Sequence, residues 1–423
     1  MNTAVIGTLA FIFVLGTAIL VHELGHFIAA RKFGVLCHEF AIGMGPILWK
    51  KRKGETLYTL RAIPIGGYVM MGQDEGERDL IKIGETIGLT LDHAGNVAKI
   101  HVSYDEGEVV GQLVSDTDTI SRELRLTLEV MGEEVVYPVA RECVYIDTKQ
   151  GREQHIVPTD RRLESKPKRQ RLVILAAGAM MNFVLAFVFV VIVGAVLGEP
   201  IGSTSQLAAV SSGDPAAEAG LLVGDHIVAI DDTPIHSGED LVAALNSTDE
   251  VLITFERDGQ VMEVYVTPEA HRVQEGVYRH LIGVSLVTER EHSIAGTFRY
   301  AAAEFRNGFT LIFMTLGMLA SGEAGVQDLS GPVGVAYMTT QFATQGMLML
   351  LVFASLININ VGIFNLLPLP ALDGGHIFFI GIEAIIGKPV NAKLRNAVQI
   401  VGFALFMMLF IFTFFNDIFR FFL

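Results

Sequence analysis

The stretch TAVIGTLAFIFVLGTAILVHELGHFIAAR occupies residues 3–31 and contains His22-Glu23-Leu24-Gly25-His26. Eighteen residues from Ala4 to Val21 carry no charge, enough with the flanking turns to cross a hydrocarbon core of about 30 Å as an α-helix. No basic residue precedes the run and no small-residue cleavage site follows it, so a secretory signal peptide fits poorly. The sequence therefore predicts a transmembrane helix over residues 1–33.

Three further apolar runs are long enough to span a membrane. They lie at Leu172–Gly198, about Gly346–Leu367 and about Ala397–Phe415, and they define predicted spans over residues 170–198, 345–376 and 396–416. Residues 295–322 contain a shorter uncharged stretch, 308–320, and their aromatic side chains fall on one helical face, so we expect an interfacial amphipathic helix there. With 51% hydrophobic and 18% charged residues, the chain cannot be an ordinary cytosolic protein, and we expect a polytopic α-helical membrane protein with four transmembrane helices.

The distribution of charge predicts the orientation of the spans. Basic residues cluster after the first span, before the second, and between the third and fourth, which places these loops in the cytoplasm. They are Arg31, Lys32, Lys50, Lys51, Arg52, Lys53, Arg161, Arg162, Lys166, Lys168, Arg169, Arg171, Lys388, Lys393 and Arg395. Residues 199–340 instead hold 20 Asp plus Glu and 6 Lys plus Arg, and we expect them outside. The formal net charge of −15 disfavours a nucleic-acid partner.

Two segments have the polarity of domains exposed to water. Residues 75–160 contain alternating runs such as 99–103 and 124–130, which predict a cytosolic β-rich insert without recognisable chemistry. Residues 201–288 mix strand patterns with one helix and predict an external α+β domain. The expected strands are Val251–Phe255, Val261–Val266 and Leu281–Leu286, and the expected helix lies near Glu239–Leu245. Cys37 and Cys143 are too few and too far apart for a disulfide scaffold.

The H-E-x-x-H pattern at residues 22–26 points to a metal. Two histidines four residues apart on a helix direct their imidazoles the same way and can ligate one zinc ion, with Glu23 beside it as general base. The motif lies about 27 Å along the helix from Ala4, at the cytoplasmic side of the membrane. Ionisable residues at such a depth are costly unless they have a partner, so we interpret the motif as functional rather than as a neutral core pair.

A catalytic zinc needs a third protein ligand and an open position. The best candidate is Asp373 in the run NLLPLPALDGGH at residues 365–376, because prolines and glycines break a helix there at membrane depth, where loose backbone must line a cavity. His376 is a competing ligand, or an interfacial or supporting histidine. Three asparagines on the third span, Asn358, Asn360 and Asn365, should face the same cavity. They either hold a substrate backbone or bond neighbouring helices, and for Asn365 we favour substrate contact.

These residues resemble the site-2 protease family of zinc intramembrane metalloproteases, and in particular its regulator-of-sigma-factor proteases of the Gram-positive, single-PDZ type. The resemblance covers almost the whole chain. It rests on residues 22–26, on 178–186 in the second span, on Ser330-Gly331-Pro332-Val333-Gly334, and on 360–375. Two positions depart from the family pattern: Gly178-Ala179 stands where relatives often have Gly-Pro, and Asn358 where many have Ser.

The resemblance implies that Asp373 is the third ligand of one zinc ion per chain, and that residues 201–288 form a PDZ domain that captures peptide ends or filters substrates by size. It also implies that Gly54–Gly72 forms a re-entrant β-hairpin within a membrane-associated segment, 34–74. Independently, Leu57–Ala62 alternates like a strand and Gly66-Gly67 permits a tight turn. We expect the residues that position the substrate to come from the hairpin and from the third span. They are Gly66, Gly67, Asn360, Asn365, Pro368 and Pro370.

The expected function is zinc-dependent intramembrane proteolysis in the bacterial cytoplasmic membrane. Lipid surrounds the enzyme, and the resemblance implies that its substrates are single-span membrane proteins already cleaved outside: anti-sigma factors, remnant signal peptides and peptide pheromone precursors. A transporter, with His22, Glu23, His26 and Asp373 lining an ion path, would show polar residues in several spans and inverted internal symmetry, neither of which is apparent. A PDZ adaptor with an inactive metal site is disfavoured by the intact Glu23.

Overall fold

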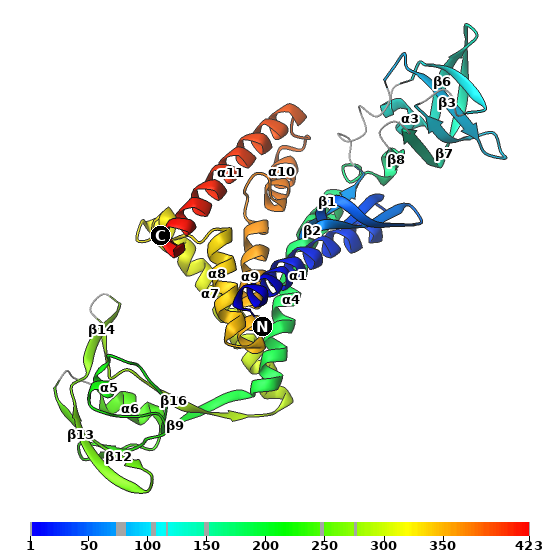
Figure 1. Ribbon diagram of the computed structural model, residues 1–423. Coiled ribbons are helices and arrows are strands. Elements are labelled where there is room, and N and C mark those ends of the chain that lie inside the picture. The colour runs from blue at the N-terminus through cyan, green and yellow to red at the C-terminus, as the bar shows by residue number, and fades with distance from the viewer. Residues whose placement is uncertain are drawn as a thin grey trace. The chain divides into compact units, whose positions relative to one another are not determined.

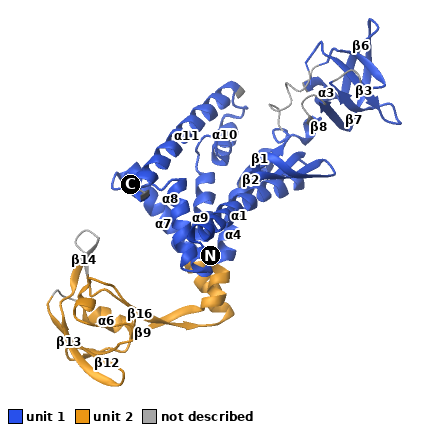
Figure 2. Cartoon of the chain, viewed as in Figure 1, with its two compact units in different colours: residues 1–189, 305–423 blue, residues 190–304 orange. Residues whose placement is uncertain are grey.

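The computed structural model describes residues 2–72, 82–102, 107–115, 117–147, 152–245, 249–274 and 277–422 (Figure 1). The chain divides into two compact units (Figure 2). The first comprises residues 1–189 and 305–423, and the second comprises residues 190–304.

Four helices are long and apolar enough to cross a membrane, judged by length and composition, among the residues that the structure describes. They are α1 (Thr3–Lys32), α4 (Lys168–Leu197), α9 (Met347–Leu366) and α11 (Ala392–Phe422). Each coincides with one of the four apolar runs. Three further helices accompany them: α7 (Ile294–Ser321), α8 (Pro332–Thr344) and α10 (Asp373–Ile386). Helix α7 is the amphipathic segment expected over 295–322, and it is not among the candidate spans.

Strands β1 (Cys37–Lys53) and β2 (Thr56–Met71) form a hairpin that folds over on itself. Phe40 pairs with both Tyr58 and Val69, so the first half of β1 lies between the two halves of β2. The expectation of a hairpin starting at Gly54 was wrong, because its first strand already begins at Cys37. The chain does reverse next to Gly66-Gly67, as expected: Leu60 and Gly67 both pair with Ile42, so β2 doubles back over residues 61–66, where Gly66 adopts a φ of 91°. A separate turn at Gly54-Glu55 joins β1 to β2.

The insert that follows the hairpin is rich in strands, as predicted. Its elements are β3 (Thr86–Leu91), β4 (Val97–His101), β5 (Val109–Leu113), α3 (Thr117–Glu123), β6 (Arg125–Val130), β7 (Glu133–Asp147), β8 (Arg152–His155) and the 3₁₀ turn η1 (Thr159–Arg161). The strand order is β4-β3-β5-β6-β7-β8, and a parallel pairing of β4 with β7 closes the sheet around a core that includes Ile87, Leu89, Ile100, Leu126 and Leu128.

The second unit is built on a five-strand path, β13-β12-β10-β9-β16. Its elements are β9 (Glu199–Val210), α5 (Pro215–Glu218), β10 (His226–Ile230), β11 (Thr233–Pro234), α6 (Gly238–Ala244), β12 (Val251–Arg257), β13 (Gln260–Val266), β14 (Glu269–Gln274), β15 (Val277–Leu281) and β16 (Val284–Glu291). The strand predicted over Leu281–Leu286 is not continuous, because Gly283 adopts a φ of 78° between β15 and β16. The other two predicted strands and the helix are present.

The 330–334 motif explains how α11 is attached. Asp417 near the end of α11 is 1% exposed, and its carboxylate accepts the backbone N–H groups of Gly331 and Gly334 at the start of α8, over 3.1 and 2.7 Å. A carboxylate at a helix N-terminus is stabilised by the unsatisfied N–H groups there. A Cβ at Gly331 would meet Thr413 at 2.7 Å, so glycine is needed for this approach. The 3₁₀ turn η2 (Val326–Asp328) precedes the motif.

Candidate metal centre

Three candidate ligand atoms from two distant parts of the chain converge in the first unit. His22 Nε2 and His26 Nε2 each lie 3.1 Å from Asp373 Oδ2, and the two nitrogens lie 3.1 Å from each other. Both histidines are buried, and Asp373 is half-buried at the first residue of α10. The part of the chain that the structure describes contains this one group of His, Cys, Asp and Glu with metal-ligand geometry.

The triangle fits zinc. Tetrahedral Zn–N and Zn–O bonds of about 2.0–2.1 Å place neighbouring ligand atoms about 3.3 Å apart, close to the separations observed. His26 Nδ1 lies 2.8 Å from the carbonyl oxygen of Ile174. It therefore donates its proton there, and the Nε2 lone pair is directed towards the other two ligands. An imidazole held in this way is prepared to bind a cation.

Asn182, on α4, supports His22. Its amide nitrogen lies 3.4 Å from His22 Nδ1, while its Oδ1 is buried with no partner among the described residues. The two ends of an amide are nearly alike in shape. With the amide turned over, Oδ1 accepts the Nδ1–H of His22, which satisfies the orphaned oxygen and frees Nε2 of His22 for a metal.

Glycines allow α1 and α4 to approach closely enough for these contacts. A Cβ at Gly178 would collide with His26 Nε2 and would lie 2.8 Å from His22 Nε2. A Cβ at Gly25 would collide with the carbonyl oxygen of Ala177. Small residues at such crossings are typical of packed membrane helices. Helix α4 thus presents Ile174, Gly178 and Asn182, at spacings of four residues, to the two histidines.

The break after α9 brings Asp373 to the histidines. A Cβ at Gly374 would collide with the carbonyl oxygen of Leu367, so only glycine lets the loop 367–372 fold back onto the start of α10. Ala371 adopts a φ of 70°, which is unfavourable for a residue with a Cβ. Helix α11 holds the loop in place, because Gln399 accepts the N–H of Ala371 and Gly402 packs against Pro370.

The hairpin holds Glu23 beside the metal ligands. The backbone N–H of Val69 donates to Glu23 Oε2 over 3.0 Å. Gly67 allows this close approach because it has no side chain. A Cβ added at Gly67 would lie 3.8 Å from Glu23 Cγ and only 2.7 Å from the carbonyl oxygen of Ala41. The hairpin itself is stiffened by Glu39, which accepts from Arg61 and Tyr68 over 2.8 Å each. Gly67 therefore lies next to Glu23, whereas the side chain closest to a Cβ at Gly66 would be that of Met44.

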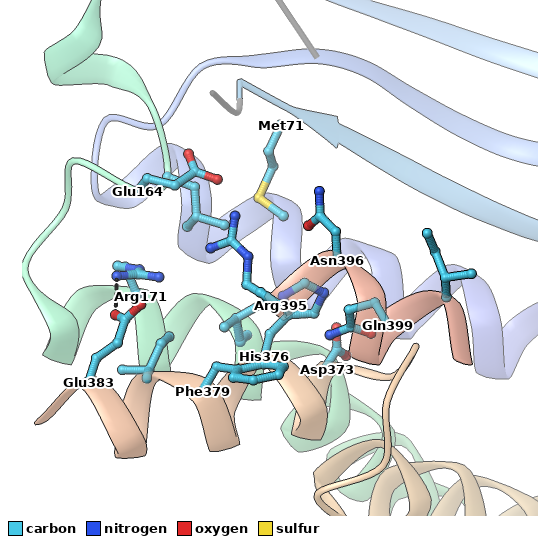
Figure 3. A pocket seen from close by; sticks show the side chains of 14 residues that line it. Met71, Glu164, Arg171, Asp373, His376, Phe379, Glu383, Arg395, Asn396 and Gln399 are labelled. Carbon is cyan, nitrogen blue, oxygen red and sulfur yellow. Dashed lines mark hydrogen bonds and ion pairs between the residues drawn. The ribbon is translucent and has the colours of Figure 1, made fainter. Parts of the chain in front are cut away.

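A cavity of about 450 Å³ opens on Asp373 (Figure 3). His376 lines this cavity together with Glu164, Arg395 and Gln399. His376 does not belong to the group formed by His22, His26 and Asp373. The cavity also contains the ion pair between Arg171 of α4 and Glu383 of α10, at 3.2 Å. Lys168 donates to the carbonyl oxygen of Glu383 over 2.6 Å. These contacts tie the far end of α10 to the helix that supports both histidines.

The three asparagines of α9 do not share one surface. Asn358 is fully buried and Asn365 is half-buried, seven residues away on the same face. A continuous helix turns Asn360 about 160° away from Asn358, so the expectation of a common cavity was wrong. Both Asn358 and Asn365 donate to backbone carbonyls four residues earlier, at Ala354 and Val361. Pro368 is exposed and Pro370 is half-buried in the loop before Asp373.

Four supporting residues were not found from the sequence: Asn182, Glu383, Gln399 and Gly402. Asn182 and Glu383 are polar residues next to or within apolar runs, and that signal could have found them. Gln399 lies within the predicted span 396–416 and carries the same signal, whereas Gly402, which packs on loop 367–372 far away in the sequence, does not.

Comparisons with known proteins agree with this chemistry. Residues 10–409 match the model of Peptidase family M50. Zinc metalloprotease RasP from Shouchella clausii is 37% identical, over 97% of this chain and 98% of its own length. Regulator of sigma-W protease RasP from Bacillus subtilis is 36% identical, over 98% and 99% respectively. Among solved structures, the PDZ domain of an SdrC-like protein from Listeria monocytogenes covers 20% of this chain and 88% of its own, at 22% identity and a TM-score of 0.17.

The two histidines of α1, the carboxylate of α10 and the similarity over nearly the full length lead to one assignment. The chain belongs to Peptidase family M50, the site-2 protease family, and is a zinc metalloprotease.

Proposed function

We propose that this chain is an intramembrane endopeptidase that cleaves single-span membrane proteins. The observation that carries the proposal is the triangle of His22, His26 and Asp373 on helices α1 and α10, with Glu23 fixed beside it. The three ligands lie on or next to helices apolar enough to cross a membrane, so the peptide bond to be cleaved must come to that depth.

His22, His26 and Asp373 would hold zinc. When bound, the ion supplies Lewis acidity, which polarises a carbonyl and lowers the pKa of a water. Glu23 takes the proton of the attacking water and passes it to the leaving amine. The Val69 N–H keeps one oxygen of Glu23 fixed and leaves the other for this proton, so the base is oriented before the substrate arrives.

The substrate strand would pair with the second half of β2. Residues 67–71 pair with β1 on one side only, and the Val69 N–H on the other side points to Glu23. An unwound substrate segment added along this edge would therefore run past Glu23. Asn365, together with Pro368 and Pro370, is proposed to contact the substrate from α9 and the loop that follows it, whereas Asn360 faces away from Asn365 on the helix.

The proposed substrates are anti-sigma factors and remnant signal peptides, after a first cleavage outside the cell. The support is that one relative bears the name of a sigma-W regulator protease. We place the protein in the bacterial cytoplasmic membrane, with its basic loops and the metal centre towards the cytoplasm.

Residues 201–288 are proposed to be an external PDZ domain that binds peptide ends or limits substrate size. A cavity of about 820 Å³ lies between α6, with Leu241 and Leu245, and β16, with Val284 and Leu286. Strand β16 ends the five-strand path, so a peptide could add to its edge beside α6.

The test is cleavage of a model single-span substrate by the full chain in proteoliposomes. Cleavage should fall about 10²–10⁴-fold in Glu23→Gln and should vanish with a zinc chelator, returning when zinc is restored. Asp373→Ala should also lose zinc. Unchanged cleavage in Glu23→Gln and in chelator would exclude the proposed mechanism, and undiminished zinc in Asp373→Ala would exclude that ligand.

A further inference from the structure

The second half of β1 changes abruptly from apolar to basic. Ile47, Leu48 and Trp49 are 45%, 67% and 53% exposed, and they lie at an irregularity in the pairing of the strand between Ile47 and Trp49. The next four residues, 50–53, are all basic. Among the described residues this segment pairs only with residues 56–61, so one edge of the strand is unpaired, and its three apolar side chains are exposed. An uncovered apolar strand requires an apolar environment.

The polarity boundary falls between Trp49 and Lys50. Tryptophan followed by cations is typical of the level where lipid headgroups meet hydrocarbon. Helix α1 reaches the same kind of boundary in its last turn, which contains Arg31 and Lys32. The basic ends of the two segments meet, because Arg31 and Lys53 line the same small cavity.

This cavity has a volume of about 240 Å³ and a cationic lining. Its ionisable side chains are Arg31, Lys53, Arg161, Glu55 and Cys37. Arg161 donates to both oxygens of Glu55, and this contact, with a smaller opposing effect of burial, holds the pKa of the Glu55 carboxyl below its usual value. Glu55 is therefore ionised and already paired. Arg31 and Lys53 have no anionic partner among the described residues, so they give the cavity its uncompensated charge of +2.

We propose that this cavity, between the end of α1, the turn of the hairpin and Arg161, binds the headgroup phosphate of an anionic phospholipid. The cavity is larger than a phosphate group, and its excess charge is complementary to one. Trp49 lies four residues before Lys53, about 13 Å along the strand, on the side where the acyl chains would run. That continuity of apolar strand and cationic cavity favours a lipid over free phosphate.

The bound headgroup would stabilise the hairpin. Thr56 of the cavity donates to the carbonyl oxygen of Cys37 over 2.9 Å, and β1 links that end to Val69 through the Phe40–Val69 pair. Lipid bound at the turn therefore braces the same sheet that holds Glu23. This site does not depend on the proposed substrates, and its test does not depend on proteolysis.

Trp49 is the single tryptophan of the chain, so intrinsic tryptophan fluorescence of the full protein reports on this strand alone. The protein is reconstituted in phosphatidylcholine vesicles with a minor fraction of phosphatidylglycerol, and either lipid carries brominated, quenching acyl chains. We expect brominated phosphatidylglycerol to quench Trp49 more strongly at equal mole fraction, with about a fivefold preference per cation. Equal quenching by the two lipids would overturn the proposal.

The paired variant Arg31→Gln/Lys53→Gln should lose the preference and retain zinc, which shows that it is folded. The control variant Lys388→Gln/Lys393→Gln removes the same amount of charge from another basic loop and should keep the preference for phosphatidylglycerol. Arg31→Lys/Lys53→Arg retains both charges and should also keep it. If Arg31→Gln/Lys53→Gln does not fold, the difference in quenching measured with the unaltered chain still tests the proposal. Loss of the preference in about 10 mM inorganic phosphate, or in the control variant as strongly as in the first, would reject a lipid site here.

Discussion

The backbone N–H of Val69 in the hairpin donates to Oε2 of Glu23 on α1, over 3.0 Å. The residue proposed as general base is thereby held by a strand that begins more than 30 residues later in the chain. The hairpin therefore helps to orient Glu23, and it is also the surface proposed for the substrate.

Replacing Val69 with proline tests this contact, because it removes the donor and little else. The N–H points away from the β1 ladder, where proline is tolerated. We expect kcat to fall by about tenfold, the value of one charge-assisted hydrogen bond, with zinc content unchanged. Val69→Ala keeps the N–H and is the matched control. Cleavage kinetics in proteoliposomes that show equal losses in the two variants would contradict the role of the N–H.

Asn182 should determine how tightly zinc is held. Asn182→Ala removes the partner of His22 Nδ1, and loss of such a partner typically weakens metal affinity about 10–100-fold. Asn182→Asp retains an acceptor and should retain zinc. Chelator titration of the purified protein measures the affinity, with Asn360→Ala as the control on α9. Wild-type affinity in Asn182→Ala would show that the amide does not orient His22.

Gly178→Ala should abolish zinc binding without removing any ligand. The new methyl group would occupy space now filled by His26 Nε2 and would force α4 away from α1. Gly381→Ala is the control, since nothing lies within 4 Å of a Cβ there and alanine favours a helix. Zinc content and cleavage are measured together. A Gly178→Ala protein with normal zinc would mean that the two helices can separate at no cost to the site.

The second unit should lose stability in acid. Asp225 is 1% exposed and receives two hydrogen bonds from Arg257, both 2.7 Å. Burial raises the pKa of its carboxyl, but the contacts with Arg257 and the Leu222 N–H outweigh it and hold the pKa below its usual value. Because the pKa of Asp225 is lower in the folded state than its unfolded value of about 3.9, the ionised carboxylate stabilises the fold at pH values above about 3.9. This stabilisation is lost as the pH falls through the folded-state pKa.

Hydrogen exchange of residues 199–291 in the full chain measures this effect between pH 6 and 3. Asp225→Asn should destabilise the unit at neutral pH, because it removes the buried carboxylate that accepts two hydrogen bonds from the half-buried Arg257. It should also remove much of the acid sensitivity. Asp258→Asn, in an exposed turn with a φ of 52°, is the control and should match the unaltered chain. Identical pH profiles for Asp225→Asn and the unaltered chain would contradict this assignment.

Much of the metal centre could be predicted from local patterns. The spacing of His22 and His26 on a helix, and the proline and glycine break before Asp373, already point to these three residues as candidate ligands, because helix periodicity and the cost of polar groups in an apolar medium act locally. The apolar runs likewise predict the four long helices. Such features depend on neighbouring residues alone.

The asparagines of α9 show that composition alone does not predict the direction in which a polar side chain points. Asn360 has the same composition signal as Asn358 and Asn365, but its helical phase directs it elsewhere. Gly66 and Gly67 both suggested a turn, but only Gly66 lies in the reversal of β2, with a φ of 91°, whereas Gly67 allows the close approach to Ala41. A glycine shows that the backbone needs space or an unusual φ, and only the packing shows which.

By itself, the sequence determined the number of long apolar helices, the ligand types and the chemistry of zinc-dependent hydrolysis, since these follow from hydrophobicity, spacing and donor type. Only the tertiary structure decided what orients the site: Asn182 beside His22, Val69 beside Glu23, and Gln399 on the loop before Asp373. These partners are separated by between 28 and 160 positions. A hydrogen bond between such residues exists only once the helices and the hairpin have packed, so no local pattern contains it.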